Sequence, residues 1–360
     1  MEKRRVRGAA WPAVGLWVFA EVLCGCGGIQ ATLSRPPNPI TSVTPSATGM
    51  PNSVMAFAGF EFVSVQGTGE IVSYNLVSGA RVASYATPCA DPSGMVATRI
   101  AGANVMAAVC YDTNSLLTLS IGNDGSLHAL GSVDGLVVPY PGIALDGTDV
   151  LVPIFGSGTA NGGVAKVSIA APAAPAITGT ATLASPAPGE VVNASSLAVA
   201  GGFVYVAAGS ESAPQSSSSS IQVISEGTMT LMGSPLTVAH SPQQVAIAGT
   251  VAYVTLFDAT EFESIDISNP AALQAMEIIQ LTTPSCHAEP VAVQSNVAYV
   301  GCFAEGNVAR FDVSNPARME QMTAIDGIAS PQSMTFAGNS LLVTDATTGG
   351  QAYVIDLNEF

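Results

Sequence analysis

The chain has 360 residues, of which 36 are glycine and 23 are proline; 48% are hydrophobic and only 10% are charged. This composition is too apolar for a disordered protein, and the short apolar runs between Gly, Pro, Ser and Asn residues predict many short β-strands. The net charge of −16 repels phosphate backbones, which argues against nucleic acid as a partner.

The N-terminal stretch MEKRRVRGAAWPAVGLWVFAEVLCGCGG has a basic start and then an uncharged apolar run over residues 9–20. Such a run is too short to span a bilayer and is typical of a secretory signal peptide. Its end, Leu23-Cys24-Gly25-Cys26, resembles the bacterial lipobox, in which cleavage before the last cysteine leaves that cysteine free for lipidation. The resemblance implies a lipoprotein signal peptide over residues 1–25, a lipid anchor on Cys26 and a place in the cell envelope, on the periplasmic side or at the surface. The alternative is an ordinary signal peptide that contains two cysteines.

Residues 26–50 are polar and rich in proline, which predicts a tether between the lipid anchor and a folded domain. The folded domain is expected over residues 51–360.

A unit of apolar strand, small turn and second apolar strand recurs along this domain. Residues 251–270, VAYVTLFDATEFESIDISNP, and residues 297–316, VAYVGCFAEGNVARFDVSNP, are the most similar pair. Seven copies centre on the turn residues Gly59, Gly102, Gly147, Gly201, Gly249, Ser295 and Gly338. Intervals of 43 to 54 residues are those of β-propeller blades. The sequence therefore predicts an all-β, seven-bladed propeller with four-stranded antiparallel blades.

The seventh copy stops at Phe360, directly after its third strand. Without a fourth strand the ring would have an open edge, which invites aggregation. We expect an N-terminal strand near residues 40–44 to supply the missing strand and close the ring.

Two kinds of motif resemble known propeller families. FESIDISNPAAL and VARFDVSNPARM resemble the LVIVD repeat, while NDGSLHALGS and SEGTMTLMGS are similar to a hairpin of YVTN-type, lactonase-like propellers. The resemblance covers residues 51–360 and implies the seven-bladed fold. It does not select a function, because these families contain binding proteins, surface proteins and a few enzymes.

Four cysteines remain after Cys24 and Cys26 are set aside. Cys89 and Cys286 each precede a first strand, and Cys110 and Cys302 each end the following second strand. These points are neighbours in an antiparallel pair, so we predict the disulfides Cys89–Cys110 and Cys286–Cys302. Buried free thiols are the alternative.

Several polar residues fall on the face where the first strands begin, and the family resemblance implies that this face carries a ligand site. The candidate ligand-binding residues there are His240 and His287. The candidate ligands for a divalent cation, the one cofactor considered, are Asp112, Asp258, Asp345 and Glu289, with Asp91 and Glu305 nearby. The alternative is structural, because aspartate is common in turns, where its carboxylate binds local backbone amides.

Arg99 stands three positions before its turn residue, where five of the seven copies have alanine. A buried arginine is costly unless it is paired, and Asp146 in the next copy is the expected partner. Alternatively, Arg99 projects into the central channel and holds an anionic ligand.

Motifs of several enzyme classes are missing from the sequence. Both tryptophans, Trp11 and Trp17, lie in the predicted signal peptide, and the chain has no Cys-x-x-Cys-His, P-loop or Gly-x-Ser-x-Gly motif. We therefore expect a binding or scaffolding module without a catalytic site, with a small ligand or an envelope protein as partner. A lactonase-like hydrolase with a metal on the same face is the alternative.

Overall fold

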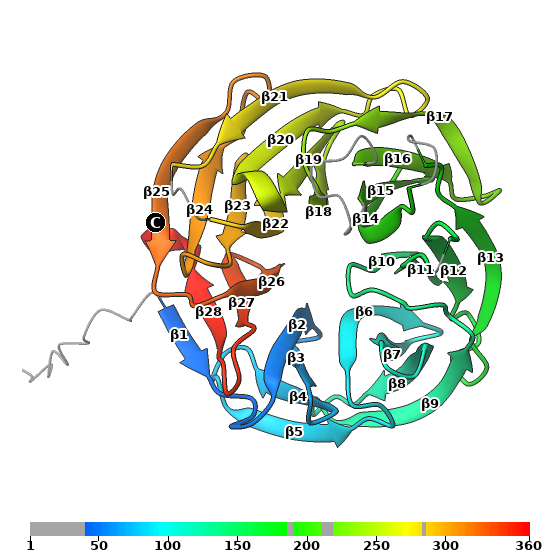
Figure 1. Cartoon of the computed structure of the whole chain (residues 1–360). Helices are drawn as coiled ribbons and strands as arrows, with labels where there is room; N and C mark the ends of the chain where they lie inside the picture. The colour runs from blue at the N-terminus through cyan, green and yellow to red at the C-terminus, as the bar shows by residue number, and fades with distance from the viewer. Residues whose placement is uncertain (1–39, 158, 186–189, 210–218, 283–285) are drawn as a thin grey trace, which may run out of the picture. The chain divides into compact units, whose positions relative to one another are not determined.

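The computed structural model describes residues 40–157, 159–185, 190–209, 219–282 and 286–360. In this part of the chain, seven sheets of four antiparallel strands are arranged in a ring (Figure 1). The prediction of an all-β, seven-bladed propeller is confirmed. The predicted signal peptide, Cys26 and most of the predicted tether lie outside the described residues.

The blades follow one another in chain order, from the innermost strand outward. Blade 1 consists of β2 (Met50–Phe57), β3 (Phe60–Gln66), β4 (Glu70–Asn75) and β5 (Arg81–Ala86). Blade 2 consists of β6 (Pro92–Ile100), β7 (Ala103–Cys110), β8 (Ser115–Ile121) and β9 (Leu127–Asp134). Blade 3 consists of β10 (Ala144–Asp146), β11 (Asp149–Ile154), β12 (Gly163–Ser168) and β13 (Ala176–Thr182). Blade 4 consists of β14 (Asn193–Ala200), β15 (Phe203–Gly209), β16 (Ser220–Ser225) and β17 (Thr230–Thr237).

Blade 5 consists of β18 (Pro242–Ala248), β19 (Val251–Leu256), β20 (Glu261–Asp266) and β21 (Gln274–Gln280). Blade 6 consists of β22 (Ala288–Gln294), β23 (Val297–Cys302), β24 (Asn307–Asp312) and β25 (Glu320–Asp326). Blade 7 consists of β26 (Pro331–Ala337), β27 (Ser340–Asp345), β28 (Ala352–Asp356) and the N-terminal strand β1 (Ile40–Val43). Two short 3₁₀ helices, η1 (Phe257–Ala259) and η2 (Leu357–Glu359), follow β19 and β28.

The position of a strand within its blade determines its composition. The second and third strands, such as β23 and β24, are buried almost throughout, because neighbouring blades cover both of their faces. The outermost strands, such as β25, alternate between exposed and covered residues because one face meets water. This difference is why the inner strands form nearly continuous apolar runs in the sequence.

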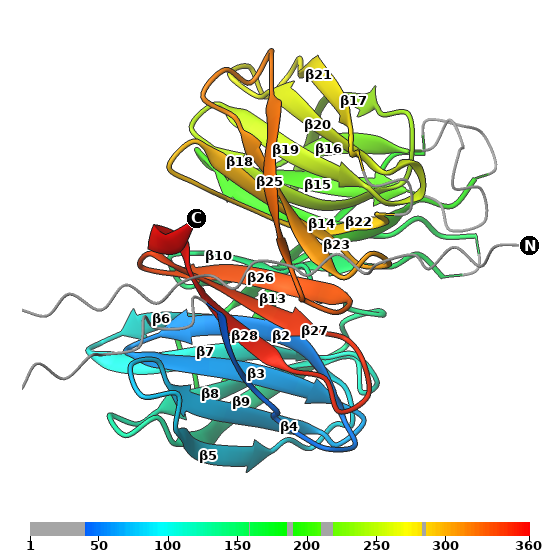
Figure 2. The same ribbon diagram turned by 90° about the vertical axis from the view of Figure 1, so that its left-hand side faces the viewer.

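The ring is closed by the first strand of the chain. β1 pairs antiparallel with β28, from Ile40 opposite Ile355 to Val43 opposite Ala352. Blades 7 and 1 also pack together, with β26 and β27 against β2 (Figure 2). The Thr344 hydroxyl donates a hydrogen bond of 3.2 Å to the backbone oxygen of Asn52 across this seam. The predicted closing strand is confirmed.

Both predicted disulfides are present. Cys89 is bonded to Cys110 and Cys286 to Cys302, with Cα–Cα distances of 5.9 and 4.4 Å. Disulfides persist in oxidising compartments and are rare in the reducing cytosol, so the two bridges indicate an exported protein.

The described residues contain no helix with the length and hydrophobicity needed to cross a membrane.

Candidate functional site

A polar opening lies on the face where the first strand of each blade begins, which we call the upper face. A cavity of about 420 Å³ opens there, and we call it the mouth. Blades 1, 2, 3, 6 and 7 line it, with Asn52, Gln66, Asp91, Ser93, Tyr111, Tyr140, Phe303 and Gln332 as the main side chains. Asp91 is the one charged residue among the described residues that line the mouth.

A repeated position lies near the start of the first strands, at the upper face of the ring. Pro51, Pro92, Pro242 and Pro331 pair with the end of the second strand, and each is followed by a shift in register. Such a bulge redirects a side chain and is common beside binding sites. We call the residues that follow this position in six blades the collar: Asn52, Ser93, Ser195, Gln243, Glu289 and Gln332.

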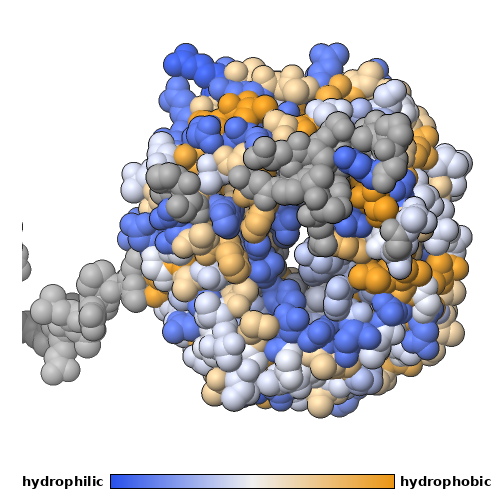
Figure 3. Space-filling view, in the orientation of Figure 1, coloured by the Kyte–Doolittle hydropathy of each residue, from blue (hydrophilic) through white to orange (hydrophobic). Residues whose placement is uncertain are grey.

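Below the collar the opening continues into the central channel. A narrow space of about 40 Å³, lined in part by Asn52, Gln243 and Gln332, connects the mouth to a channel of about 370 Å³. Hydroxyl and amide groups of Ser53 and Gln244 line the channel together with apolar side chains. Figure 3 shows the hollow at the centre of the ring, bordered by hydrophilic residues. The opening therefore presents hydrogen-bonding groups without a concentration of charge.

Hydrogen bonds between blades hold the backbone of the collar in place. The Thr255 hydroxyl of blade 5 accepts from the backbone N–H of Gln244 at 3.0 Å and donates to the backbone oxygen of Glu289 in blade 6 at 2.8 Å. Ser195 of blade 4 likewise donates to the backbone oxygen of Pro242 in blade 5 at 2.8 Å. These hydrogen bonds fix part of the collar backbone before any ligand binds, which lowers the entropic cost of binding.

Aromatic side chains surround the mouth above the collar. The ring of Tyr140 packs against Phe155 with centroids 4.5 Å apart, and its backbone N–H donates to Pro153. Tyr111 is 42% exposed, and its backbone N–H donates to the oxygen of Asp91. Aromatic faces on anchored loops provide contact area at little conformational cost.

Two of the predicted metal ligands have structural roles in turns. The carboxylate of Asp112 accepts hydrogen bonds from the backbone N–H groups of Ala90 and Asp91, at 3.0 and 3.3 Å. Asp345 is buried and accepts from the backbone N–H of Thr347 at 2.9 Å. For these residues the structure supports the alternative interpretation as turn residues.

The remaining predicted site residues are dispersed over blades 5 and 6. His240 lies 3.8 Å from Glu261 (Nε2 to Oε2), whereas exposed His287 packs its ring against Phe257 at 5.0 Å. Glu289 belongs to the collar and is 8% exposed, and burial raises the pKa of its carboxyl to about 7. The side chain of Asp258 lies outside the described residues. Among the residues that the structure describes, no three His, Cys, Asp or Glu side chains are grouped to hold a metal ion.

The structure places Arg99 away from both its expected partner and the channel. In blade 2, the part of β6 between its register shift and its turn covers residues 95–100. In blade 1, the equivalent part of β2 covers only residues 54–57. The hairpin of blade 2 is therefore two residues longer in each strand, and Arg99 lies on this extension. Its exposed side chain donates from Nε to Asn104 at 3.2 Å, and the channel is lined by the earlier residues 95–97 of β6. Within the described residues Arg99 forms no ion pair with Asp146.

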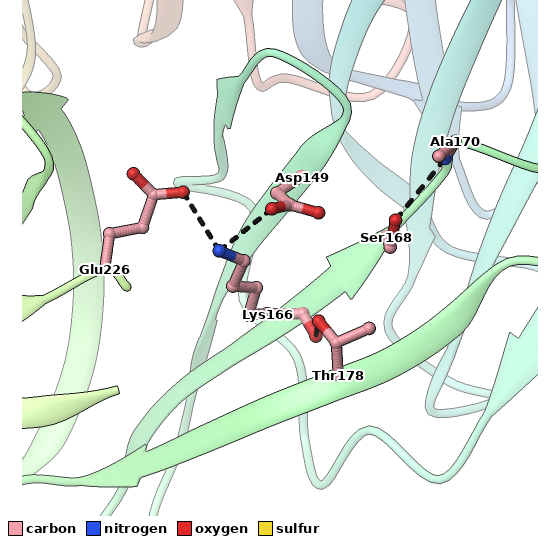
Figure 4. A network of polar contacts seen from close by, with 6 residues as sticks. All are labelled: Asp149, Lys166, Ser168, Ala170, Thr178 and Glu226. Atoms are coloured by element: carbon pink, nitrogen blue, oxygen red, sulfur yellow. Dashed lines mark hydrogen bonds and ion pairs between the residues drawn. The ribbon is translucent and has the colours of Figure 1, made fainter. Parts of the chain in front are cut away.

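Asp146 lies instead beside a polar cluster that joins blades 3 and 4. Lys166 contacts Asp149 in its own blade at 2.9 Å and Glu226 of blade 4 at 3.3 Å (Figure 4). Burial and the neighbouring Asp146 raise the pKa of Glu226, although Lys166 opposes this effect. One lysine between carboxylates of two blades is the pattern of an ion-pair link between those blades.

The family resemblance implied a ligand site on this face, and Asp91 was named there, but the other main side chains of the mouth were not predicted, because they are amides, hydroxyls and aromatic rings without a recognised motif. One signal was present: a proline followed by a small or amide polar residue is the first or second residue of four of the first strands, in PNS, PSG, PQQ and PQS. In a ring of blades, equivalent positions lie at the same height around the axis.

Comparisons with known proteins agree with this architecture. The family model of the LVIVD repeat matches residues 193–212, 241–280 and 286–326, which include the whole of blades 5 and 6. The LVIVD repeats predicted from two motifs are therefore confirmed. No curated protein sequence matches the chain.

Several solved structures share the fold. A virginiamycin B lyase from Staphylococcus aureus has 14% identity and a TM-score of 0.64, and the match covers 88% of this chain and 98% of the lyase. A putative 6-phosphogluconolactonase from Bacteroides uniformis has 14% identity and a TM-score of 0.63, with 82% and 88% of the two chains covered. BamB from Moraxella catarrhalis has 11% identity and a TM-score of 0.55, with 85% and 84% covered. At these identities the likeness concerns the fold alone.

Proposed function

We propose that this protein is a binding propeller of the bacterial cell envelope, held at the membrane by a lipid on Cys26, and that its ligand binds in the mouth. The observation that carries the proposal is the opening formed by the mouth, the collar and the channel. Rigid hydrogen-bonding groups and aromatic rings converge there around a concave space.

The side chains of the mouth indicate what the ligand is like. Asn52 and Gln332 each offer a donor and an acceptor, and Tyr140 and Phe303 offer apolar faces. An anionic ligand would lose its hydration without gaining a countercharge, and the single carboxylate of Asp91 could balance only one positive charge. The ligand class is therefore an uncharged molecule with both hydrogen-bonding groups and a flat apolar face, such as a neutral saccharide or an uncharged peptide.

We expect Tyr140→Ala to weaken binding at the mouth at least tenfold, because it removes an anchored aromatic face. A tenfold loss corresponds to about 1.4 kcal/mol. The measurement is isothermal titration calorimetry with two probes, chitotriose as a neutral saccharide and N-acetyl-trialanine amide as an uncharged peptide. Leu130→Ala is the control, since Leu130 is exposed on the outer strand β9. Equal affinities of wild type and Tyr140→Ala for any probe that binds would show that the ligand site does not lie in the mouth.

A lactonase-like hydrolase with a metal on the upper face is the competing function. The fold shared with a putative 6-phosphogluconolactonase favours it, but only at the level of architecture. Lactone hydrolysis that stops when a chelator is added would replace the binding function with this one.

Lipid anchoring has its own test. We expect Cys26→Ser to shift the protein from the membrane fraction to the soluble fraction when the full chain is expressed in a bacterial host, because a diacylated cysteine provides a stable anchor. The readout is immunoblotting of the separated fractions, with Cys24→Ser as the matched control. Wild-type protein in the soluble fraction would exclude the lipid anchor, but it would not affect the proposal that a ligand binds in the mouth.

A further inference from the structure

A second cavity lies at the seam where the ring closes. It has a volume of about 300 Å³ and is formed between the closing strands β1 and β28 of blade 7 and the strands β3 and β4 of blade 1. We call it the seam pocket. Its lining includes Thr41, Val43, Glu61, Asn75, Ser78 and Ala352.

Glu61 is the one charged residue among the described residues that line the seam pocket. It lies on β3, opposite Ala56 and Tyr74 in the two neighbouring strands, and is only 2% exposed. Within the described residues, its Oε1 atom has no hydrogen-bond partner, and neither does the hydroxyl of Tyr74. A buried carboxyl oxygen without a partner is costly, and such a group in a native structure requires an explanation.

The surroundings of Glu61 contain no compensating charge in contact with it. Burial alone raises the pKa of Glu61 to about 7. Tyr74 faces it from β4, and β1 contributes no titratable side chain, since its sequence is ITSV. On β28, the ring of Tyr353 belongs to the core between blades 6 and 7, and the carboxylate of Asp356 accepts hydrogen bonds from Asn358.

Two charged groups lie beyond this first layer. Arg81 and Glu70 both act on the pKa of Tyr74, in opposite directions. The side chain of Arg81 is exposed, and the carboxylate of Glu70 accepts from Ser84 at 3.0 Å. Neither neutralises a charge on Glu61 inside the pocket.

We propose that the seam pocket binds a small organic cation of the primary-ammonium class through the carboxylate of Glu61. An ammonium group has three donors and no acceptor, which complements the unpartnered carboxyl oxygen of Glu61 and the hydroxyl of Ser78 in the lining of the pocket. A divalent metal fits less well, because Ca²⁺ takes six to eight oxygen ligands and Mg²⁺ requires octahedral geometry, whereas the lining provides one carboxylate.

Occupancy of this site also affects the closure of the ring. β1 forms one wall of the pocket and is the strand that completes blade 7. A ligand that contacts both β1 and β3 binds only when the seam is closed, so it stabilises the closed ring by mass action.

The test is calorimetric titration of the full chain with methylammonium chloride. We expect saturable binding at pH 8.5 and affinity about tenfold weaker at pH 6.0, because a carboxyl with a pKa near 7 is almost fully ionised at the higher pH and about one-tenth ionised at the lower. Tetramethylammonium, which carries the same charge but no N–H donor, should bind at least tenfold more weakly than methylammonium at pH 8.5.

Two isosteric variants distinguish binding by the carboxylate of Glu61 from a general effect of negative surface charge. Glu61→Gln should lose methylammonium binding at both pH values, whereas Glu70→Gln, on the same hairpin, should retain wild-type affinity. The proposal is overturned if folded wild type does not bind methylammonium at pH 8.5, or if Glu61→Gln binds as well as wild type. Should Glu61→Gln fail to fold, the ratio of the wild-type affinities at the two pH values decides, and a ratio near one overturns the proposal.

Discussion

Replacing all four bridged cysteines with alanine is expected to lower the free energy of unfolding by about 6 kcal/mol, about 3 kcal/mol for each disulfide. The bridges join residues 21 and 16 positions apart, and in the chain-entropy model a loop of this size restricts the unfolded chain by that amount. Each bridge also connects the segment before the first strand of its blade to the end of the second strand, at the upper face.

Urea unfolding followed by circular dichroism measures this effect. The double variants Cys89→Ala/Cys110→Ala and Cys286→Ala/Cys302→Ala should each show about half of the loss, because blades 2 and 6 are not neighbours and the two effects should add. Wild-type protein in a reducing agent should match the fourfold variant. A reduced wild type as stable as the oxidised protein would show that the bridges do not constrain the unfolded chain.

Phe262→Ala is expected to destabilise the propeller by about 3–5 kcal/mol, the usual cost of truncating a fully buried phenylalanine. The ring of Phe262 has no exposed surface and lies 5.1 Å from the ring of Phe311 and 5.9 Å from that of Tyr253. Phe262 belongs to blade 5 and Phe311 to blade 6, so the substitution leaves a cavity between two blades that loosens their contact.

The same unfolding measurement provides matched controls for this substitution. Phe262→Leu should cost clearly less than Phe262→Ala, because leucine fills part of the cavity. Met276→Ala, on the exposed outer strand β21 of the same blade, should stay within about 0.5 kcal/mol of wild type. Equal losses for Phe262→Ala and Met276→Ala would contradict the packing of this interface.

The candidate site shows where reasoning from a single sequence reached its limit. Asp112 and Asp345 stood out because carboxylates carry much of protein chemistry, yet both bind nearby backbone amides. Tyr140 and Gln332 drew no attention, although they line the mouth. Convergence of side chains from five blades is a property of the closed ring, and no local pattern encodes it.

Arg99 illustrates the same limit in one residue. Aligning the copies on their turn glycines placed Arg99 at a position where most copies have alanine. However, Gly102 is the second residue of the turn in blade 2, whereas Gly147 is the first residue of the turn in blade 3. The alignment was therefore shifted by one residue, and a shift by one exchanges the two faces of a strand. The longer hairpin of blade 2 then moved Arg99 out of the channel altogether.

The sequence by itself determined the seven blades, the closing strand and both disulfides, because each depends on features that are local or periodic: strand alternation, turn residues, a repeat interval and the antiparallel neighbours of two strand ends. Only the tertiary structure decided which side chains meet at the axis and at the seam. Those encounters depend on bulges, hairpin lengths and the register between blades. The polar collar and the buried, unpartnered carboxyl of Glu61 arise from such long-range geometry, because their surroundings come from strands that lie far apart in the chain.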